Sequence, residues 1–170
     1  MKARALVLLF ATMVSLTISA QNPLKKVYNE SIDPIEQLDQ AIDRAKQEGK
    51  FVICQLGGNW CIWCLRFADY IENDSIIKQT VDDNFVYIHV NYHPRRSNAP
   101  AKAEQTKALL KRLSNPVRFG FPVFVVLDET GKVLHIQDSG LLEQGDGYDH
   151  EKTLKFFQHW SPTEVKKAAL

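Results

Sequence analysis

Apolar side chains recur with two different spacings along the chain, and the spacing indicates which segments are helices and which are strands. Apolar residues at every third or fourth position predict a helix that begins after Asp33, a capping residue, and ends at Gly49. The same spacing predicts helices over residues 61–72, 100–113 and 149–160. These four segments account for the helical part of the expected fold.

Shorter segments lack this spacing and are rich in β-branched and aromatic residues. Residues 51–56 and 84–91 are continuous apolar runs, typical of strands that are buried on both faces. Residues 123–127 and 133–137 flank the turn residues 128–132, which predicts a β-hairpin. The order of helices and strands predicts an α/β domain with a central mixed β-sheet and helices on both faces.

The first twenty residues have a separate pattern. Lys2 and Arg4 precede a largely apolar run of 14 residues, from Ala5 to Ile18, and the small residues Ser19 and Ala20 follow it. This is the pattern of a secretory signal peptide, and the run is shorter than the roughly 20 apolar residues that span a membrane. We therefore predict a signal peptide over 1–20, a loosely attached lead-in over 21–32 and one domain over 33–170.

Composition and charge narrow the expected partners. The 170 residues carry a net charge of +1, which becomes −1 when the first twenty residues are removed with Lys2 and Arg4. A charge so near neutrality gives no reason to expect binding to nucleic acid. Because the longest apolar run is too short to span a membrane, we also expect no stable membrane insertion. The sequence ends in Lys-Ala-Ala-Leu rather than in an ER-retention signal, so we expect export to a bacterial periplasm.

Two of the three cysteines form a C-x-x-C pair between the first predicted strand and the second predicted helix. Cys61 would lie at the helix N-terminus, where free N–H groups and the helix dipole favour a thiolate, and Cys64 would lie one turn further on. Cys61 is then the attacking thiol and Cys64 the resolving thiol. A structural disulfide is an alternative, as is a metal site completed by Cys54 with His89 or His93. Burial of Cys54 in the predicted strand argues against the metal site.

With these residues the chain resembles the thioredoxin superfamily, specifically the exported members whose active sites read W-C-x-W-C. The resemblance covers residues 34 to 160. It depends on three segments: Trp60-Cys61-Ile62-Trp63-Cys64, Gly120-Phe121-Pro122 before the hairpin, and the hairpin turn 128–132. The resemblance implies a thioredoxin-like fold, a cis Pro122 packed against the disulfide, and a substrate surface formed by Trp60, Trp63, Phe121 and Pro122.

The chain also departs from this family. Many thioredoxins have a buried acid six residues before the first active-site cysteine, where it helps to deprotonate the resolving thiol, but this chain has Gln55 there. An amide cannot act as that base. His89, at the end of the next predicted strand, is a candidate for proton transfer, although a hydrogen-bonded strand histidine is the simpler interpretation. The basic insert 94–118 is longer than the corresponding segment of a minimal thioredoxin, and a solvated helix face is a simpler explanation of its charge than a surface that steers an acidic partner.

Together these features predict an exported thiol–disulfide oxidoreductase that exchanges its dithiol with cysteines of client proteins, acting more readily as a reductant. We expect it to need no cofactor and no metal, and to depend on a redox partner that the sequence does not identify. The alternative is a non-catalytic binding module on the same scaffold, which would hold a partner through the basic insert or the Phe121 loop.

Overall fold

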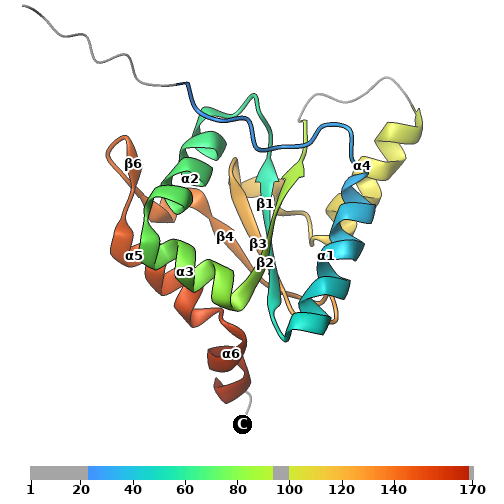
Figure 1. The fold of residues 1–170 in the computed structure, drawn as a ribbon. Coiled ribbons are helices and arrows are strands. Elements are labelled where there is room, and N and C mark those ends of the chain that lie inside the picture. The colour runs from blue at the N-terminus through green and yellow to red at the C-terminus, as the bar shows by residue number, and fades with distance from the viewer. Residues whose placement is uncertain (1–22, 94–99, 169–170) are drawn as a thin grey trace, which may run out of the picture.

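A four-stranded mixed sheet forms the centre of the computed structural model, which describes residues 23–93 and 100–168 (Figure 1). The strand order is β2-β1-β3-β4; β1 is parallel to β2 and antiparallel to β3, and β3 is antiparallel to β4. The bounds are β1 (Phe51–Gly57), β2 (Phe85–Asn91), β3 (Val123–Leu127) and β4 (Val133–Asp138). The predicted mixed sheet and the predicted hairpin are both confirmed.

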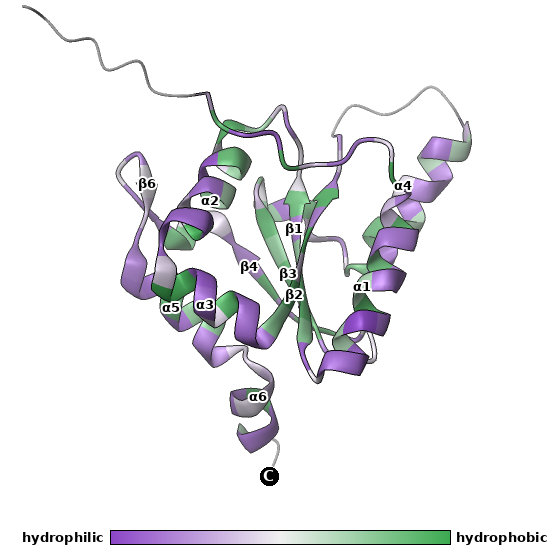
Figure 2. Cartoon of the chain, in the orientation of Figure 1, coloured by the Kyte–Doolittle hydropathy of each residue, from purple (hydrophilic) through white to green (hydrophobic). Residues whose placement is uncertain are grey.

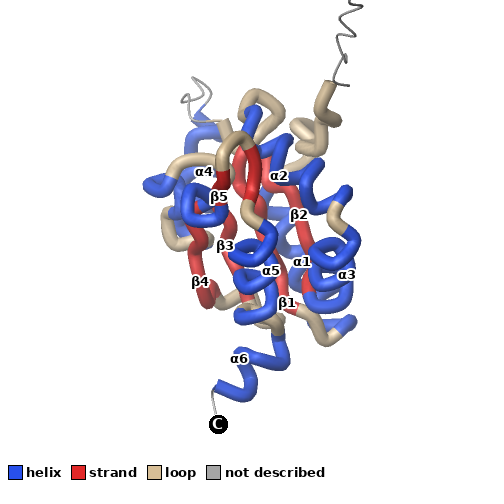
Figure 3. Tube along the Cα trace, turned by 90° about the vertical axis from the view of Figure 1, so that its left-hand side faces the viewer, coloured by secondary structure: helices blue, strands red, loops and turns tan. Residues whose placement is uncertain are grey.

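Helices cover both faces of this sheet (Figures 1 and 3). α1 and α4 lie on one face, and α2, α3 and α5 lie on the other, with α6 following α5 at the C-terminal end. The helices are α1 (Pro34–Glu48), α2 (Ile62–Asn73), α3 (Ser75–Asn84), α4 (Pro100–Arg112), α5 (His150–His159) and α6 (Pro162–Ala168). The shorter elements are the 3-10 turns η1 (Pro116–Phe119) and η2 (Ser139–Leu142), and the small hairpin of β5 (Glu143–Gln144) and β6 (Gly147–Tyr148).

Two apolar clusters fill the space between the sheet and its helices. One includes Leu38 of α1, Leu109 of α4 and Cys54 of β1, whereas the other includes Phe67 of α2 and Phe157 of α5. Because successive strand side chains point to opposite faces, β1 contributes to both clusters. Figure 2 shows the result as hydrophobic strands between helices whose outer surfaces are mainly hydrophilic.

Local capping explains where the helices begin. The Asp33 carboxylate accepts hydrogen bonds from the backbone N–H groups of Ile35 and Glu36, at 2.8 and 3.3 Å, as predicted for the start of α1. Asp74 separates α2 from α3 and caps α3 by accepting from Ile76 and Ile77, each at 3.1 Å. α2 and α3 together make the crossover that the parallel pair β1 and β2 requires.

Two expectations about burial and attachment were wrong. Residues 84–91 were expected to form a strand buried on both faces, but β2 lies at the edge of the sheet, and Tyr87 and His89 are only partly buried. The lead-in is held firmly, because Tyr28 is buried and its backbone exchanges two hydrogen bonds with the Asn59 side chain, at 3.1 and 2.8 Å. A single buried aromatic residue in a segment without regular structure has no periodicity that would have revealed it.

Some expectations fall on residues that the structure does not describe. The signal peptide at 1–20 and the arginines at 95 and 96 lie outside the described residues. In the described ranges, no helix is long and apolar enough to cross a membrane. α3, α6 and the β5–β6 hairpin were not predicted. The strands of the hairpin have two residues each, which is too short for a pattern of alternation.

Candidate active site

The C-x-x-C pair forms a disulfide at the start of α2. Cys61 is the N-cap of the helix, with an extended backbone, and its sulfur accepts a hydrogen bond from the Cys64 backbone N–H at 3.2 Å. Cys61 is 7% exposed and Cys64 is completely buried. The predicted geometry, with the first cysteine at the helix N-terminus and the second one turn further on, is therefore present.

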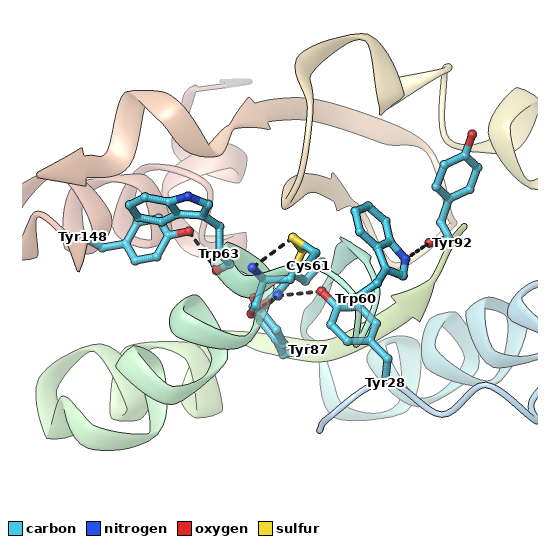
Figure 4. Close-up of a disulfide and its surroundings, with 9 residues drawn as sticks. Tyr28, Trp60, Cys61, Trp63, Tyr87, Tyr92 and Tyr148 are labelled. Carbon is cyan, nitrogen blue, oxygen red and sulfur yellow. Dashed lines mark hydrogen bonds between the residues drawn. A yellow bond between two sulfur atoms is a disulfide. The ribbon is translucent and has the colours of Figure 1, made fainter. Parts of the chain in front are cut away.

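Exposed apolar side chains border Cys61 on its outer side. Trp60 and Ile62 are 44% and 52% exposed, which is unusual for residues of this size. The Trp60 indole N–H donates to the Tyr92 carbonyl at 3.0 Å (Figure 4). The Trp60 ring meets the Phe121 ring edge-on, with centroids 5.3 Å apart. A side chain at Gly58 would collide with the Trp60 indole, so glycine at that position lets the indole fold back over the loop.

Trp63 is held on the opposite side of the motif. The Tyr148 hydroxyl donates to the Trp63 carbonyl at 3.1 Å, and the two rings meet edge-on at 5.8 Å (Figure 4). The Arg66 guanidinium lies 4.8 Å from the Trp63 ring centroid. Tyr148 comes from β6, so sequence patterning gave no indication that it would reach the motif.

The loop before β3 completes the surroundings of the disulfide. The Phe121–Pro122 peptide bond is cis, as the resemblance implied, and Pro122 is buried. Phe121 packs against the cluster formed by Tyr28, Cys61, Cys64 and Leu65, and its ring stacks on Tyr92 at 5.4 Å. The structure thus brings Trp60, Trp63 and Phe121 around the cysteine pair.

Gln55 is buried beneath Cys64 and is fully hydrogen-bonded. Its amide nitrogen donates to the Cys64 carbonyl at 2.8 Å and to the Tyr28 hydroxyl at 2.7 Å, and its amide oxygen accepts from the Tyr87 hydroxyl at 2.6 Å. The amide therefore occupies the position of the family's buried acid without being able to ionise. No sequence pattern singled out Tyr28, whose hydroxyl is part of this network.

His89 lies beside this hydrogen-bond network, and its ring contacts are with tyrosine rings rather than with a cysteine sulfur. It pairs with Gln55 across the β1–β2 ladder, and its ring contacts are with Tyr28 at 5.3 Å and Tyr87 at 5.4 Å. Burial lowers the pKa of His89 to about 4, and its Nε2 atom is buried without a hydrogen-bond partner. His89 is therefore neutral at pH 7, and its role in proton transfer stays a prediction.

The third cysteine is separated from the pair by the sheet. Cys54 is completely buried in the cluster that packs against α1 and α4, and burial raises the pKa of its thiol. Cys61 and Cys64 belong to a different cluster, on the side of Gln55. This placement leaves Cys54 in the role predicted for it, that of a small apolar core residue.

The basic insert partly pairs with its own chain. Arg112 of α4 bonds to Asp39 of α1 at 2.6 Å, and the Arg118 guanidinium donates to the backbone carbonyls of Ser114 and Asn115. The lysines of α4 are exposed. A solvated helix face accounts for what the structure shows of this segment.

A buried sheet that leads into a cysteine-capped helix, with a cis-proline loop opposite, defines a thioredoxin-like dithiol site. The thioredoxin-like family model matches residues 33–129, and the chain belongs to that family.

Curated relatives with similar sequences are disulfide-exchange proteins. The chain is 30% identical over 101 residues to disulfide bond reductase DsbH of Chlamydia pneumoniae, covering 58% of each chain. It is 29% identical over 101 residues to thiol:disulfide interchange protein DsbD of Escherichia coli (strain K12), covering 59% of this chain but only 16% of DsbD. The chain thus spans little more than half of the first relative and a small part of the second.

Solved structures with a similar fold support the architecture. A disulphide isomerase from Xylella fastidiosa Temecula1 superposes with a TM-score of 0.64 at 20% identity, covering 80% of this chain and 97% of that one. A DsbH oxidoreductase superposes with a TM-score of 0.50 at 22% identity, covering 82% and 91%. At these identities the likeness concerns the fold alone.

Proposed function

We propose that this chain is an exported thiol–disulfide oxidoreductase that reduces disulfides of client proteins in the periplasm. The observation that carries the proposal is the Cys61–Cys64 disulfide at the N-terminus of α2, with Cys61 7% exposed beside the exposed Trp60 and Ile62, and Cys64 completely buried. The disulfide closes a very short loop and constrains the unfolded chain little, so stabilisation is a poor reason for it. Thiol exchange explains why the disulfide lies at a helix N-terminus and why Cys64 is more deeply buried than Cys61.

The reaction uses the two thiols in sequence. In the reduced protein, the Cys61 thiolate attacks one sulfur of a client disulfide, so that a mixed disulfide forms and the other client sulfur leaves as a thiolate. Cys64 then loses its proton to solvent and attacks Cys61 Sγ, which releases the second client thiolate. The two client thiolates take up protons, the client gains two electrons, and the Cys61–Cys64 bond forms again.

The surface around Cys61 suits contact with unfolded or extended client segments. Trp60 and Ile62 offer exposed apolar area next to the reactive sulfur, and Phe121 precedes the cis proline. Apolar and aromatic anchors of this kind contribute most of the binding energy in many interfaces. We assign Trp60, Trp63, Phe121 and Pro122 to client binding on this basis.

The reducing direction is supported by the residues between the cysteines. Neither Ile62 nor Trp63 can donate a charged hydrogen bond to a sulfur, which leaves the helix terminus as the main support for a Cys61 thiolate. A less stabilised thiolate makes the dithiol a better electron donor. The similarity to disulfide bond reductase DsbH of Chlamydia pneumoniae supports the same direction.

Insulin reduction tests the activity. Residues 21–170 should reduce insulin in the presence of dithiothreitol faster than dithiothreitol alone, and the Cys61→Ser/Cys64→Ser double variant should lose that acceleration. Equal rates for the two proteins would favour the non-catalytic binding module instead.

Equilibration with glutathione tests the direction. We expect a reduction potential nearer to the thioredoxin value of about −270 mV than to the value of about −120 mV found for strong oxidants of the superfamily. A potential above about −180 mV would instead make the protein an oxidase or isomerase.

A further inference from the structure

Tyr28 is a buried side chain close to Cys64. It shares one buried cluster with Cys61, Cys64 and Leu65, and its hydroxyl is held by Gln55 (Figure 4). A side chain at Gly57 would collide with Cys64 Sγ and would come within 2.9 Å of the Tyr28 hydroxyl. The hydroxyl and the sulfur therefore both border the bare backbone of Gly57.

The hydrogen bonds of Gln55 determine which way the Tyr28 hydroxyl can act. The Cys64 carbonyl can only accept, so the atom facing it must be the amide nitrogen of Gln55, and that same nitrogen donates to the Tyr28 oxygen. The Tyr87 hydroxyl then donates to the remaining amide oxygen. Because the Tyr28 oxygen accepts from Gln55, the Tyr28 hydrogen is available for another acceptor.

Ionisation does not compete with this donor role. Tyr28 is 5% exposed, and burial raises the pKa of its hydroxyl above the ordinary value of about 10. Tyr28 consequently stays protonated at neutral pH. It can donate a hydrogen bond but cannot serve as a base.

We propose that the Tyr28 hydroxyl, oriented by Gln55, donates a hydrogen bond to the Cys64 thiolate when the mixed disulfide is resolved, in place of the buried acid found in many thioredoxins. Tyr28 is then a catalytic residue of the resolving step, and Gln55 is a positioning residue. The inference rests on the proposed thiol–disulfide exchange and assigns a further residue to it.

The step balances without a further reactant. The Cys64 thiol gives its proton to solvent, and the thiolate accepts the hydrogen bond from Tyr28 while it attacks Cys61 Sγ. The bond between Cys61 and the client sulfur breaks, the Cys61–Cys64 bond forms, and the client sulfur leaves with the electron pair and is protonated by solvent. Tyr28 keeps its proton throughout.

The reaction of the reduced protein with one equivalent of 5,5′-dithiobis(2-nitrobenzoate) separates the two thiols in time. Attack by Cys61 releases a first thionitrobenzoate and leaves a mixed disulfide, and attack by Cys64 releases a second. Stopped-flow absorbance across a range of pH gives the rate and the apparent pKa of each phase. Tyr28→Phe removes the hydroxyl and keeps the ring.

The matched control is Tyr148→Phe, which removes another buried hydroxyl bonded to the backbone of the same motif. We expect Tyr28→Phe to slow the second phase by about tenfold and to raise its apparent pKa by about 1, the size expected for a hydrogen bond to a charged group. The first phase should not change. Tyr148→Phe should leave the second phase as in the unmodified protein.

The proposal is overturned if the second phase of Tyr28→Phe keeps its wild-type rate and apparent pKa, or if Tyr148→Phe slows it equally. A second measurement does not depend on the folding of Tyr28→Phe. In Cys61→Ser, the pKa of Cys64, taken from its rate of reaction with methyl methanethiosulfonate, should lie at or below the ordinary cysteine value of about 8.5 despite complete burial. A value above about 9.5 would contradict the hydrogen bond.

Failure of the proposed function gives a different result. If the unmodified protein does not accelerate insulin reduction, the exchange activity is wrong, whatever the variant shows. If the unmodified protein is active and Tyr28→Phe behaves identically, only the role of Tyr28 is wrong.

Discussion

The two cysteines of the disulfide lie three residues apart but in different surroundings. Cys61 is the N-cap of α2 and keeps a small exposed fraction between the exposed side chains of Trp60 and Ile62. Cys64 is completely buried, and the polar groups next to it belong to Gln55 and Tyr28. One thiol is thus placed for contact with other molecules, and the other for contact with fixed groups of the protein.

In the proposed mechanism, this difference lets one turn of helix separate two chemical roles. The helix N-terminus stabilises negative charge at its first residue, and the effect falls off within the first turn. Cys61 receives that stabilisation directly, whereas Cys64, inside the helix, depends on neighbouring side chains. Substitutions on the two sides should therefore have different consequences.

Replacing either cysteine should give the largest effect and opposite outcomes on client trapping. Cys64→Ser should accumulate mixed disulfides through Cys61, because the resolving thiol is missing, while Cys61→Ser should form none. Non-reducing gels of each variant, incubated with a disulfide-containing protein and followed by mass spectrometry, measure this. Trapping by Cys61→Ser alone would reverse the roles of the two thiols.

Filling the space beside Cys64 should destabilise the protein. Gly57→Ala would place a methyl group against Cys64 Sγ and the Tyr28 hydroxyl, and we expect a loss of about 1–3 kcal/mol in the free energy of unfolding. Gly147→Ala is the control, because a methyl group there would meet no atom within 4 Å. Urea denaturation measures both, and equal stabilities would show that the space beside Cys64 is looser than the structure indicates.

Acidification should destabilise the folded protein, because His89, near Gln55 and Cys64, is buried in its neutral form. Burial lowers the pKa of His89 to about 4 from an ordinary value of about 6.5. Between these two pH values the unfolded chain binds a proton at His89 and the folded chain does not. The free energy of unfolding should fall as pH drops from about 6.5 to about 4, with roughly 1–3 kcal/mol of that loss due to His89.

His89→Gln should remove this part of the pH dependence, as urea denaturation at several pH values would show. The exposed His159 provides the control, since His159→Gln should keep the wild-type slope. An unchanged slope in His89→Gln would mean that His89 is not buried as a neutral group.

The smallest effect is expected on the Cys61 side. Ile62→Ser removes exposed apolar area next to Cys61 and should raise the KM for an unfolded client about twofold to fivefold, with stability unchanged within about 0.5 kcal/mol. Ile76→Ser is the matched control, because Ile76 in α3 is similarly exposed, at 56%. Equal KM values for the two variants would argue against client contact at Ile62.

The sequence analysis predicted the parts of the molecule that have periodicity or a motif. The helix from Asp33 to Gly49, the β3–β4 hairpin and the position of Cys61 at a helix N-terminus all depend on local patterns, and each is confirmed. The cis bond at Pro122 came from resemblance rather than from spacing, and it is also present.

Contacts made over long distances in the chain were not predictable in this way. Tyr28 and Gln55 are 27 residues apart, and Tyr148 meets Trp63 across 85 residues. Both tyrosines come from segments with little or no regular secondary structure, where no alternation marks a buried side chain. The edge position of β2 was likewise missed, because strand order is not encoded in a single apolar run.

Competitive alkylation of the reduced protein is the most direct test of the difference between the two thiols. Brief treatment with iodoacetamide at pH 7, followed by peptide mass spectrometry, should show Cys61 modified first. Cys64 should react far more slowly, and Cys54, which is buried and whose pKa is raised by burial, should react only after unfolding. Labelling of Cys64 as fast as Cys61 would contradict the account.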